Sequence, residues 1–141
     1  MNLDEISEMW AKDSVIDDVM LDTSSMKIPQ LHAKYITLHN EYSLLLKKAK
    51  QEQNRLVHLR TLYYSGRGEP SMYEDEPFDH KLIRSEVPSW VAVDASVNKV
   101  EMKVALYETT LNSLSEILKQ VHQMSYNIKN CIEWRRFVNG T

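Results

Sequence analysis

Apolar residues recur at alternating spacings of four and three along the chain from Pro29 to Tyr63. Proline suits the first turn of a helix, and Gly66 and Gly68 supply the signal that ends one. This spacing therefore predicts a helix of about 35 residues, in which Glu52 is the one charged member of the series. The apolar members are Leu31, Tyr35, Leu38, Tyr42, Leu45, Ala49, Leu56, Leu59 and Tyr63.

The C-terminal part of the chain repeats this pattern from Val97 onward, and neither proline nor glycine interrupts it before Gly140. A sustained repeat of about 3.5 residues is typical of a left-handed, coiled-coil-like seam. A second apolar column runs beside the first one through Ile117, Met124 and Cys131. An apolar stripe of this width indicates that the helix meets more than one neighbour.

The remaining segments give weaker patterns. Residues 3–12 have the spacing of a short amphipathic helix, and residues 13–27 are interpreted as a connector. Residues 69–89 hold three prolines among acids, which favours an irregular connection. Residues 90–93 fit either a short strand or the lead-in to the last helix, and Asp94 is a plausible N-cap for that helix.

The predicted fold is therefore all-α, with two long coiled-coil-like helices and a short N-terminal helix in one domain. Residues 1–68 hold the acidic N-terminal helix and the basic helix, residues 69–93 the acidic connection, and residues 94–141 the C-terminal helix. Long exposed apolar columns usually mark interfaces, so we expect a ring-shaped homo-oligomer. A monomeric bundle with a third helix over the open side is the alternative. The expected oligomerisation residues are Val104, Tyr107, Leu111, Leu114, Leu118, Val121, Ile128 and Ile132.

Composition narrows the class of protein. Only 3 glycines and 4 prolines occur in 141 residues, which argues against a turn-rich β-sandwich. No run of about 18 apolar residues exists, so no membrane span is expected. The N-terminus is acidic and lacks the pattern of a signal peptide, and Cys131 has no second cysteine to pair with. These features favour a reducing, cytoplasmic setting.

Charge is distributed unevenly along the chain, although the formal net charge is only −3. Residues 43–68 carry six Lys or Arg and one acid. Residues 1–23 before them carry seven acids and one lysine, and residues 69–80 after them carry five acids and no Lys or Arg. The basic block between two acidic ones is hidden by the net charge, and it is the candidate site for a phosphate backbone.

The basic block combines positive charge with aromatic rings and a glycine turn. Bases on a helix bind phosphates, and tyrosines stack on unpaired nucleobases, so the combination favours single strands over a duplex. Tyr63 lies in the apolar seam and is therefore expected in the core, which leaves Tyr64 as the stacking candidate. A solvated helix face is the alternative for the lysines. The candidate DNA-binding residues are Lys47, Lys48, Lys50, Arg55, His58, Arg60, Tyr64 and Arg67.

No pattern of a catalytic, metal or cofactor site emerges. The run from Ser65 to Gly68 lacks the Gly-Lys-Ser/Thr of a phosphate-binding loop. The five histidines show no metal-ligand spacing with each other or with Cys131, which lies in an apolar column. The acids at 74–76 lie in the expected irregular connection, which is a poor platform for acid–base catalysis. The chain is therefore not expected to be an enzyme or to bind a cofactor or metal.

The run from Leu62 to Gly68 after a basic helix resembles the UvsY family of recombination mediators from T-even-type bacteriophages. The similarity extends over nearly the whole chain and is weakest in the acidic connection. Further matching positions are Lys34-Tyr35, His39, Ile128-Lys129, Arg136-Phe137 and Asn139-Gly140.

The resemblance implies a ring-shaped homo-oligomer that binds single-stranded DNA, with a RecA-like recombinase and a single-stranded-DNA-binding protein as partners. Such mediators help the recombinase, which hydrolyses ATP, to load on coated strands. A Lys-x-Arg pair tied to DNA binding in the family corresponds to His58 and Arg60 here. An imidazole is mostly neutral at pH 7, so His58 departs from the family pattern. A coiled-coil scaffold or chaperone without DNA binding and a duplex-binding architectural protein are the alternatives.

Overall fold

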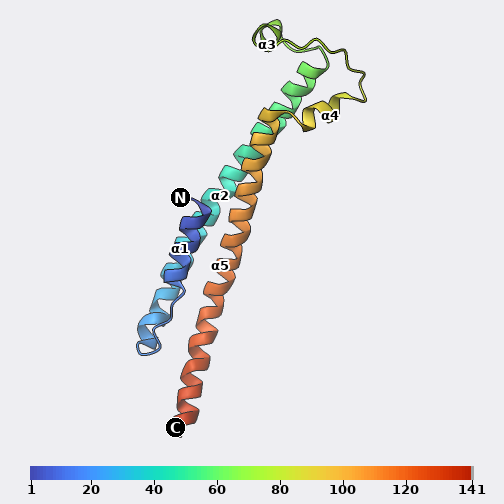
Figure 1. Ribbon diagram of the computed structural model, residues 1–141. Coiled ribbons are helices and arrows are strands. Elements are labelled where there is room, and N and C mark those ends of the chain that lie inside the picture. Colours follow the sequence, from blue (N-terminus) through green and yellow to red (C-terminus); the bar gives the residue numbers. More distant parts are fainter. Residues whose placement is uncertain (141) are drawn as a thin grey trace. The chain divides into compact units, whose positions relative to one another are not determined.

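The computed structural model describes residues 1–140, and five helices and no strand occur in this range (Figure 1). The predicted all-α class, with two long helices and a short N-terminal helix, is confirmed. None of the helices within the described range is long and apolar enough to cross a membrane. In chain order the helices are α1 (Leu3–Asp13), α2 (Leu21–Tyr64), α3 (Pro70–Asp75), α4 (Val87–Ala92) and α5 (Ala95–Asn139).

The contacts divide the chain into two compact units. Unit 1 combines Met1–Ser43 with Thr109–Thr141, and unit 2 is Leu44–Glu108. Both long helices therefore contribute to both units: α2 up to Ser43 and α5 from Thr109 onward belong to unit 1. The basic block of the sequence lies in unit 2.

In unit 1, α1 lies alongside the first half of α2 (Figure 1). Asn2 and Glu5 form a capping box that begins α1, and Ile6 is fully buried. At the other end of α1, Asp13 accepts hydrogen bonds from Lys34 Nζ at 2.6 Å and from the Tyr35 hydroxyl at 2.8 Å. These bonds hold the end of α1 against α2.

The sequence pattern placed the start of α2 at Pro29, but the helix begins eight residues earlier, at Leu21. Asp17 caps the chain entering the helix: its Oδ1 accepts the Val19 and Met20 N–H groups at 3.0 and 3.3 Å. The Asp17 N–H donates to Ser24 Oγ at 3.1 Å. Proline inside a helix costs about 3 kcal/mol, and the capping together with the burial of Leu21 offsets this cost. The connector between α1 and α2 is therefore residues 14–20, which is shorter than the predicted 13–27.

The predicted seam of α5 packs inside the chain over most of its length. Val104, Leu114, Val121 and Ile128 are buried, whereas Tyr107, Leu111 and Leu118 are half-buried and Ile132 is exposed. The second apolar column is buried at Ile117 and Met124 as well. The width of the apolar stripe is therefore largely used by contacts within one subunit.

The core of unit 2 has two clusters. Ala49 of α2 packs against Val100 and Val104 of α5, and the small alanine side chain lets the two helices approach closely. Val87, Val91 and Val97 form the second cluster, which joins α4 to the start of α5. Leu56 of α2 packs against both clusters, so it links them into one core.

The segment 69–93 is more regular than the sequence predicts, because it contains α3 and α4. Pro70 and Pro88 lie in the first turns of these helices, where a missing N–H costs nothing. The prolines therefore begin short helices instead of preventing them. The strand considered for residues 90–93 is wrong, since most of it belongs to α4.

The predicted ends of the long helices are confirmed at two capping residues. Asp94 Oδ1 accepts the N–H groups of Ser96 and Val97 at 3.0 and 3.2 Å, which begins α5. After α2, Gly66 has φ of 76° and its N–H donates to the Tyr63 carbonyl at 3.1 Å. The Arg67 N–H donates to the Leu62 carbonyl at 2.8 Å, which completes a Schellman motif.

Candidate nucleic-acid interface

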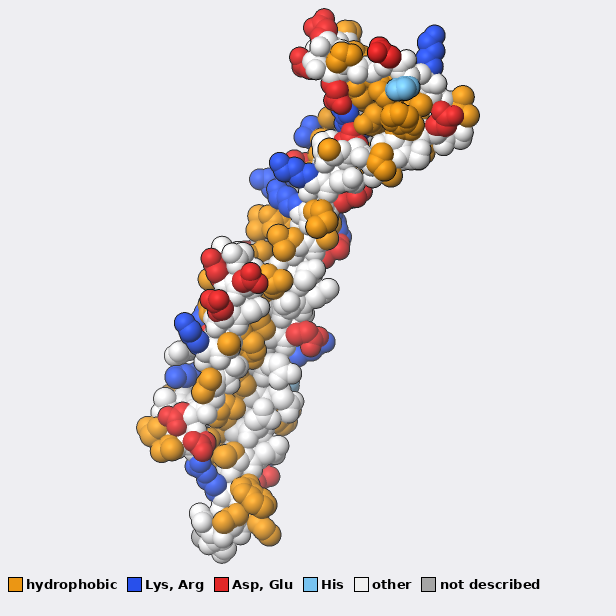
Figure 2. Space-filling model, in the orientation of Figure 1, with side chains coloured by type: hydrophobic (Ala, Val, Ile, Leu, Met, Phe, Trp, Pro, Cys, Tyr) orange, Lys and Arg blue, Asp and Glu red, His pale blue; other side chains and the backbone are white. Residues whose placement is uncertain are grey.

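The second half of α2 presents a basic face to solvent. Lys47, Lys48, Arg55 and His58 are all exposed. Positions 47, 51, 54 and 58 follow one another at three or four residues and therefore share a side of the helix, with 48 and 55 beside them. Figure 2 shows Lys and Arg side chains gathered on the surface of unit 2 beside α2.

One acid borders this basic face. Glu52 is the one acid among residues 43–68; it is half-buried and lies one helical turn from Lys48 and Arg55. Exposed Gln51 and Asn54 stand between the bases and add amide donors. Within residues 1–140 no ion pair neutralises Lys47, Lys48 or Arg55. The face therefore keeps a net positive charge for a polyanion.

Lys50 lies at the margin of this face, where it approaches Glu108 of α5. Its Nζ is 3.5 Å from Glu108 Oε1, and both side chains are about half exposed. An exposed pair of this kind stabilises a fold by about 0–1 kcal/mol, so it yields easily to a phosphate. Lys50 thus lies at the edge of the basic face, and Glu108 partly offsets its charge.

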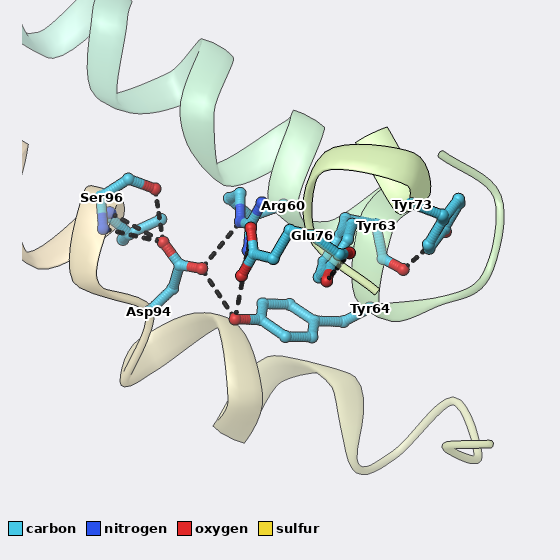
Figure 3. A network of polar contacts seen from close by, with 8 residues as sticks. Arg60, Tyr63, Tyr64, Tyr73, Glu76, Asp94 and Ser96 are labelled. Atoms are coloured by element: carbon cyan, nitrogen blue, oxygen red, sulfur yellow. Dashed lines mark hydrogen bonds and ion pairs between the residues drawn. The ribbon is translucent and has the colours of Figure 1, made fainter. Parts of the chain in front are cut away.

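Arg60 points away from this face into a network of polar contacts (Figure 3). Its Nε donates to Asp94 Oδ2 at 2.7 Å, and its Nη2 donates to both Glu76 oxygens at 3.3 Å. Only 13% of the side chain is exposed. Two carboxylates therefore neutralise the arginine that the sequence singles out for DNA contact.

The two tyrosines of the basic block belong to the same network (Figure 3). Tyr63 is buried, as its seam position predicts, and its hydroxyl donates to the Glu76 carbonyl at 2.7 Å. The Arg60 guanidinium carbon lies 4.1 Å from the Tyr63 ring centroid, in a cation–π contact. The half-buried Tyr64 donates its hydroxyl to Asp94 Oδ2 at 2.7 Å.

The pKa values within the network keep its ion pair charged at neutral pH. Burial alone would raise the pKa of the Asp94 carboxyl, but hydrogen bonds from Ser96, Tyr64, Val97 and Arg60 lower it to about 2. Burial likewise opposes the charge on Arg60, and its hydrogen bonds to Tyr64, Asp94 and Glu76 raise its pKa. Burial raises the pKa of Tyr64. The network is therefore a stable structural element rather than a group poised to titrate.

Arg67 lies beyond the end of α2, at the rim of a groove of about 830 Å³. Apolar side chains, among them Leu62, Val87 and Val91, form its floor. The groove also includes Arg84, an exposed base that the sequence analysis did not single out. Arg84 has no helical periodicity to mark it, because it precedes α4 in irregular chain.

The structure thus divides the predicted DNA-binding residues into two groups. Lys47, Lys48, Arg55 and His58 lie together on the exposed face, and Lys50 lies at its edge. Arg60 and Tyr64 lie in the internal network, and Arg67 lies in the turn after the helix. Within residues 1–140, no cluster of His, Cys, Asp or Glu is arranged to hold a metal ion.

A helical fold with a basic helix face is typical of a nucleic-acid-binding protein. The chain belongs to the UvsY family, described as recombination, repair and single-stranded-DNA-binding protein UvsY, whose model matches residues 9–141. The family is non-enzymatic, which confirms the prediction made from the absence of catalytic motifs.

The relatives cover the whole chain. The recombination protein uvsY of Enterobacteria phage T4 is 23% identical over 140 residues, which is 99% of each chain. Two crystal forms of the bacteriophage T4 recombination mediator protein UvsY share the fold, with TM-scores of 0.88 and 0.87 at 24% and 23% identity. The first alignment covers 99% of this chain and 98% of the T4 chain, and the second covers 97% and 99%.

Proposed function

We propose that the protein is a recombination mediator that binds single-stranded DNA along the exposed face of α2. In this role it promotes loading of a RecA-like recombinase onto strands coated by single-stranded-DNA-binding protein, in phage recombination, replication and repair. The observation that carries the proposal is the exposed basic face formed by Lys47, Lys48, Arg55 and His58, whose Lys and Arg side chains form no ion pair among the described residues. Membership of the UvsY family supports it.

Lys47, Lys48 and Arg55 contact the phosphates of the strand. Their charges are exposed and form no ion pair among the described residues. Lys50 adds a contact once its exposed pair with Glu108 opens. His58 supplies a hydrogen bond. Arg67 contacts the strand beyond the end of the helix, where its side chain is exposed.

Arg60 and Tyr64 act through position instead of direct contact. To reach a phosphate, Arg60 has to leave Asp94 and Glu76, and a carboxylate left behind in a largely buried site is unfavourable. The pair instead joins the end of α2 to the start of α5. Loss of Arg60 is therefore expected to weaken DNA binding by disordering the end of the face.

A titration of fluorescent oligo(dT) at several salt concentrations tests the proposed face. Each lost phosphate contact on a single strand lowers the slope of log K against log salt by about 0.7. The triple variant Lys47→Gln, Lys48→Gln, Arg55→Gln should therefore lower the slope by about 2 and weaken binding at every salt concentration. Lys103→Gln, an exposed lysine of α5 in the same unit, is the matched control.

An unchanged slope in the triple variant would place the DNA elsewhere on the protein. Absence of binding by the unmodified protein at low salt would favour a coiled-coil scaffold without DNA binding. Stronger binding of duplex than of oligo(dT) would favour a duplex-binding architectural protein. Loading of the recombinase is tested separately, by its ATPase rate on strands coated with single-stranded-DNA-binding protein, with and without the mediator.

We also propose that the protein assembles into a ring of identical subunits. The end of α5 carries exposed apolar side chains at Ile132, Trp134, Phe137 and Val138 (Figure 2). Trp134 and Phe137 stack on each other at 5.7 Å and are 65% and 77% exposed. Apolar surface of this kind is typical of an interface. Several basic faces on one ring would hold a single strand by multivalent contact.

A further inference from the structure

Unit 2 contains a second pocket that the proposed DNA contacts do not use. It has a volume of about 340 Å³ and is bounded by the end of α2, the chain after α3, and α4. In Figure 2 an apolar surface with histidine colour on it, flanked by acids, faces the viewer in the α3–α4 region. The pocket is lined by Tyr63, Tyr64, Glu76, Pro77, Phe78, Asp79, His80 and Trp90.

Aromatic rings form most of the wall of this pocket. Phe78 lies edge-on to Trp90, with 5.5 Å between ring centroids, and His80 lies 5.3 Å from Trp90. Tyr64 completes the cluster, 5.2 Å from Phe78 and 6.0 Å from Trp90. Phe78 and Trp90 are only half-buried, and His80 is exposed. Part of each ring is therefore available to a ligand.

The charge around the rings is negative. Glu76 and Asp79 both line the pocket and both are exposed. Residues 69–80 hold five acids and no Lys or Arg. Arg60 reaches Glu76, but Asp94 already offsets its charge. This surface repels a phosphate backbone and attracts a cation.

The aromatic cluster already holds one guanidinium group. Arg60 lies against its inner side, with its guanidinium carbon 4.1 Å from the Tyr63 centroid and 5.1 Å from the Tyr64 centroid. The planar guanidinium stacks on aromatic faces and pairs with carboxylates at the same time. The pocket lining offers both kinds of group through Trp90, Phe78 and Asp79.

We propose that this pocket binds an arginine side chain presented by a basic surface segment of a partner protein. The guanidinium lies over the Trp90 and Phe78 rings, and Asp79 and Glu76 supply the opposite charge. A lysine ammonium fits the same pocket more weakly, because it lacks the planar face that stacks on the rings. The site is separate from the basic face of α2, so one subunit can hold DNA and a basic partner together.

Full-length protein labelled with 5-fluorotryptophan provides a direct test, because Trp10, Trp90 and Trp134 are its three tryptophans. Single Trp→Phe variants assign the three fluorine resonances. The probe is an eight-residue Gly/Ser peptide with three arginines, compared with peptides in which lysine or glutamine replaces arginine. The arginine peptide should shift the Trp90 resonance, the lysine peptide should do so less, and the glutamine peptide should leave it unchanged.

Variants measured by anisotropy of the fluorescein-labelled arginine peptide identify the contacts. Trp90→Leu should weaken binding by about five- to tenfold, whereas Trp90→Phe keeps an aromatic face and should weaken it by about threefold or less. Asp79→Asn should weaken it by about threefold. Glu8→Gln removes one exposed acid from unit 1 and should leave the affinity unchanged. Far-UV circular dichroism of each variant checks that the helices are intact.

The proposal is wrong if Trp90→Leu and Asp79→Asn, both folded, bind the arginine peptide as tightly as the unmodified protein. It is equally wrong if oligo(dT) shifts the Trp90 resonance and loses affinity in Trp90→Leu, because the pocket then binds nucleobases. Oligo(dT) affinity of Trp90→Leu should stay within about twofold of the unmodified protein. Failure of the peptide test with intact DNA binding would leave the proposed mediator function standing.

Discussion

Replacement of Asp94 by asparagine removes the negative charge from the network around Arg60 and keeps the oxygen that caps α5. The asparagine side-chain oxygen can still accept the Ser96 and Val97 N–H groups, so the cap of α5 is retained. The negative charge 2.7 Å from Arg60 Nε is lost, and Arg60 keeps only the more exposed Glu76. The asparagine Nδ2 takes the place of Oδ2, which accepts from Arg60 Nε and the Tyr64 hydroxyl, so the variant removes the ion pair and these two hydrogen bonds while it preserves the start of the helix.

The size of the effect follows from the pKa of Asp94. The folded protein lowers this pKa from 3.8 to about 2. Each unit corresponds to about 1.4 kcal/mol, so the charged form of Asp94 stabilises the folded state by about 2 kcal/mol at pH 7. Because the folded-state pKa is depressed, this stabilisation is complete above pH 4 and is lost as the pH falls from 4 to 2.

Urea unfolding followed by far-UV circular dichroism measures this quantity. At pH 7, Asp94→Asn should lower the free energy of unfolding by about 2 kcal/mol with little change in the m-value. The difference from the unmodified protein should shrink between pH 4 and pH 2. Protein concentration has to be constant throughout, because subunit association adds to apparent stability.

Asp75→Asn is the matched control, since Asp75 is an exposed acid of the same unit with no hydrogen bond or ion pair of its side chain in the described chain. Its stability should be within about 0.5 kcal/mol of the unmodified protein. A loss below about 0.5 kcal/mol in Asp94→Asn would show that the pair with Arg60 does not stabilise the fold. A larger loss that persists at pH 2 would mean that packing or capping, not charge, had been disturbed.

Three further substitutions test other features. Gly66→Ala should cost about 1 kcal/mol in urea unfolding, because φ of 76° is strained for alanine although no atom lies within 4 Å of its Cβ. Tyr35→Phe should lower the free energy of unfolding by about 1 kcal/mol in thermal denaturation, since Asp13 loses one of its two hydrogen-bond donors. The double variant Trp134→Ser, Phe137→Ser should sediment as smaller species than the unmodified protein while it keeps its helical circular dichroism. Unchanged sedimentation would exclude this end of α5 as the assembly interface.

Local patterns in the sequence predict the helices well. The alternation of apolar residues is set by the helical period, and it identifies both long helices without tertiary information. Local residues also determine the end of α2 and the start of α5. Asp94 caps N–H groups at the start of α5, and Gly66 after α2 adopts a conformation that other residues avoid. The apolar pattern missed the early start of α2, because the contact between Asp17 and Ser24 stabilises turns before Pro29, which the sequence placed in the first turn.

The sequence also determines the basic block, because the positions of six bases among residues 43–68 are read directly from it. The sequence cannot tell which of these bases are free. Arg60 lies 34 residues from Asp94 and 16 from Glu76, so no local pattern predicts that two acids neutralise it. Only the tertiary structure brings these residues together and leaves Lys47, Lys48 and Arg55 exposed.

The apolar seam of α5 shows the same division between sequence and tertiary structure. A heptad pattern predicts that a column of side chains is buried. It does not indicate whether the same chain or another copy buries that column. The structure buries Leu114, Val121 and Ile128 within the chain and leaves Trp134 and Phe137 exposed. Periodicity fixes local conformation through backbone geometry, whereas the partner of each side chain depends on contacts between residues far apart in sequence, which only the folded chain specifies.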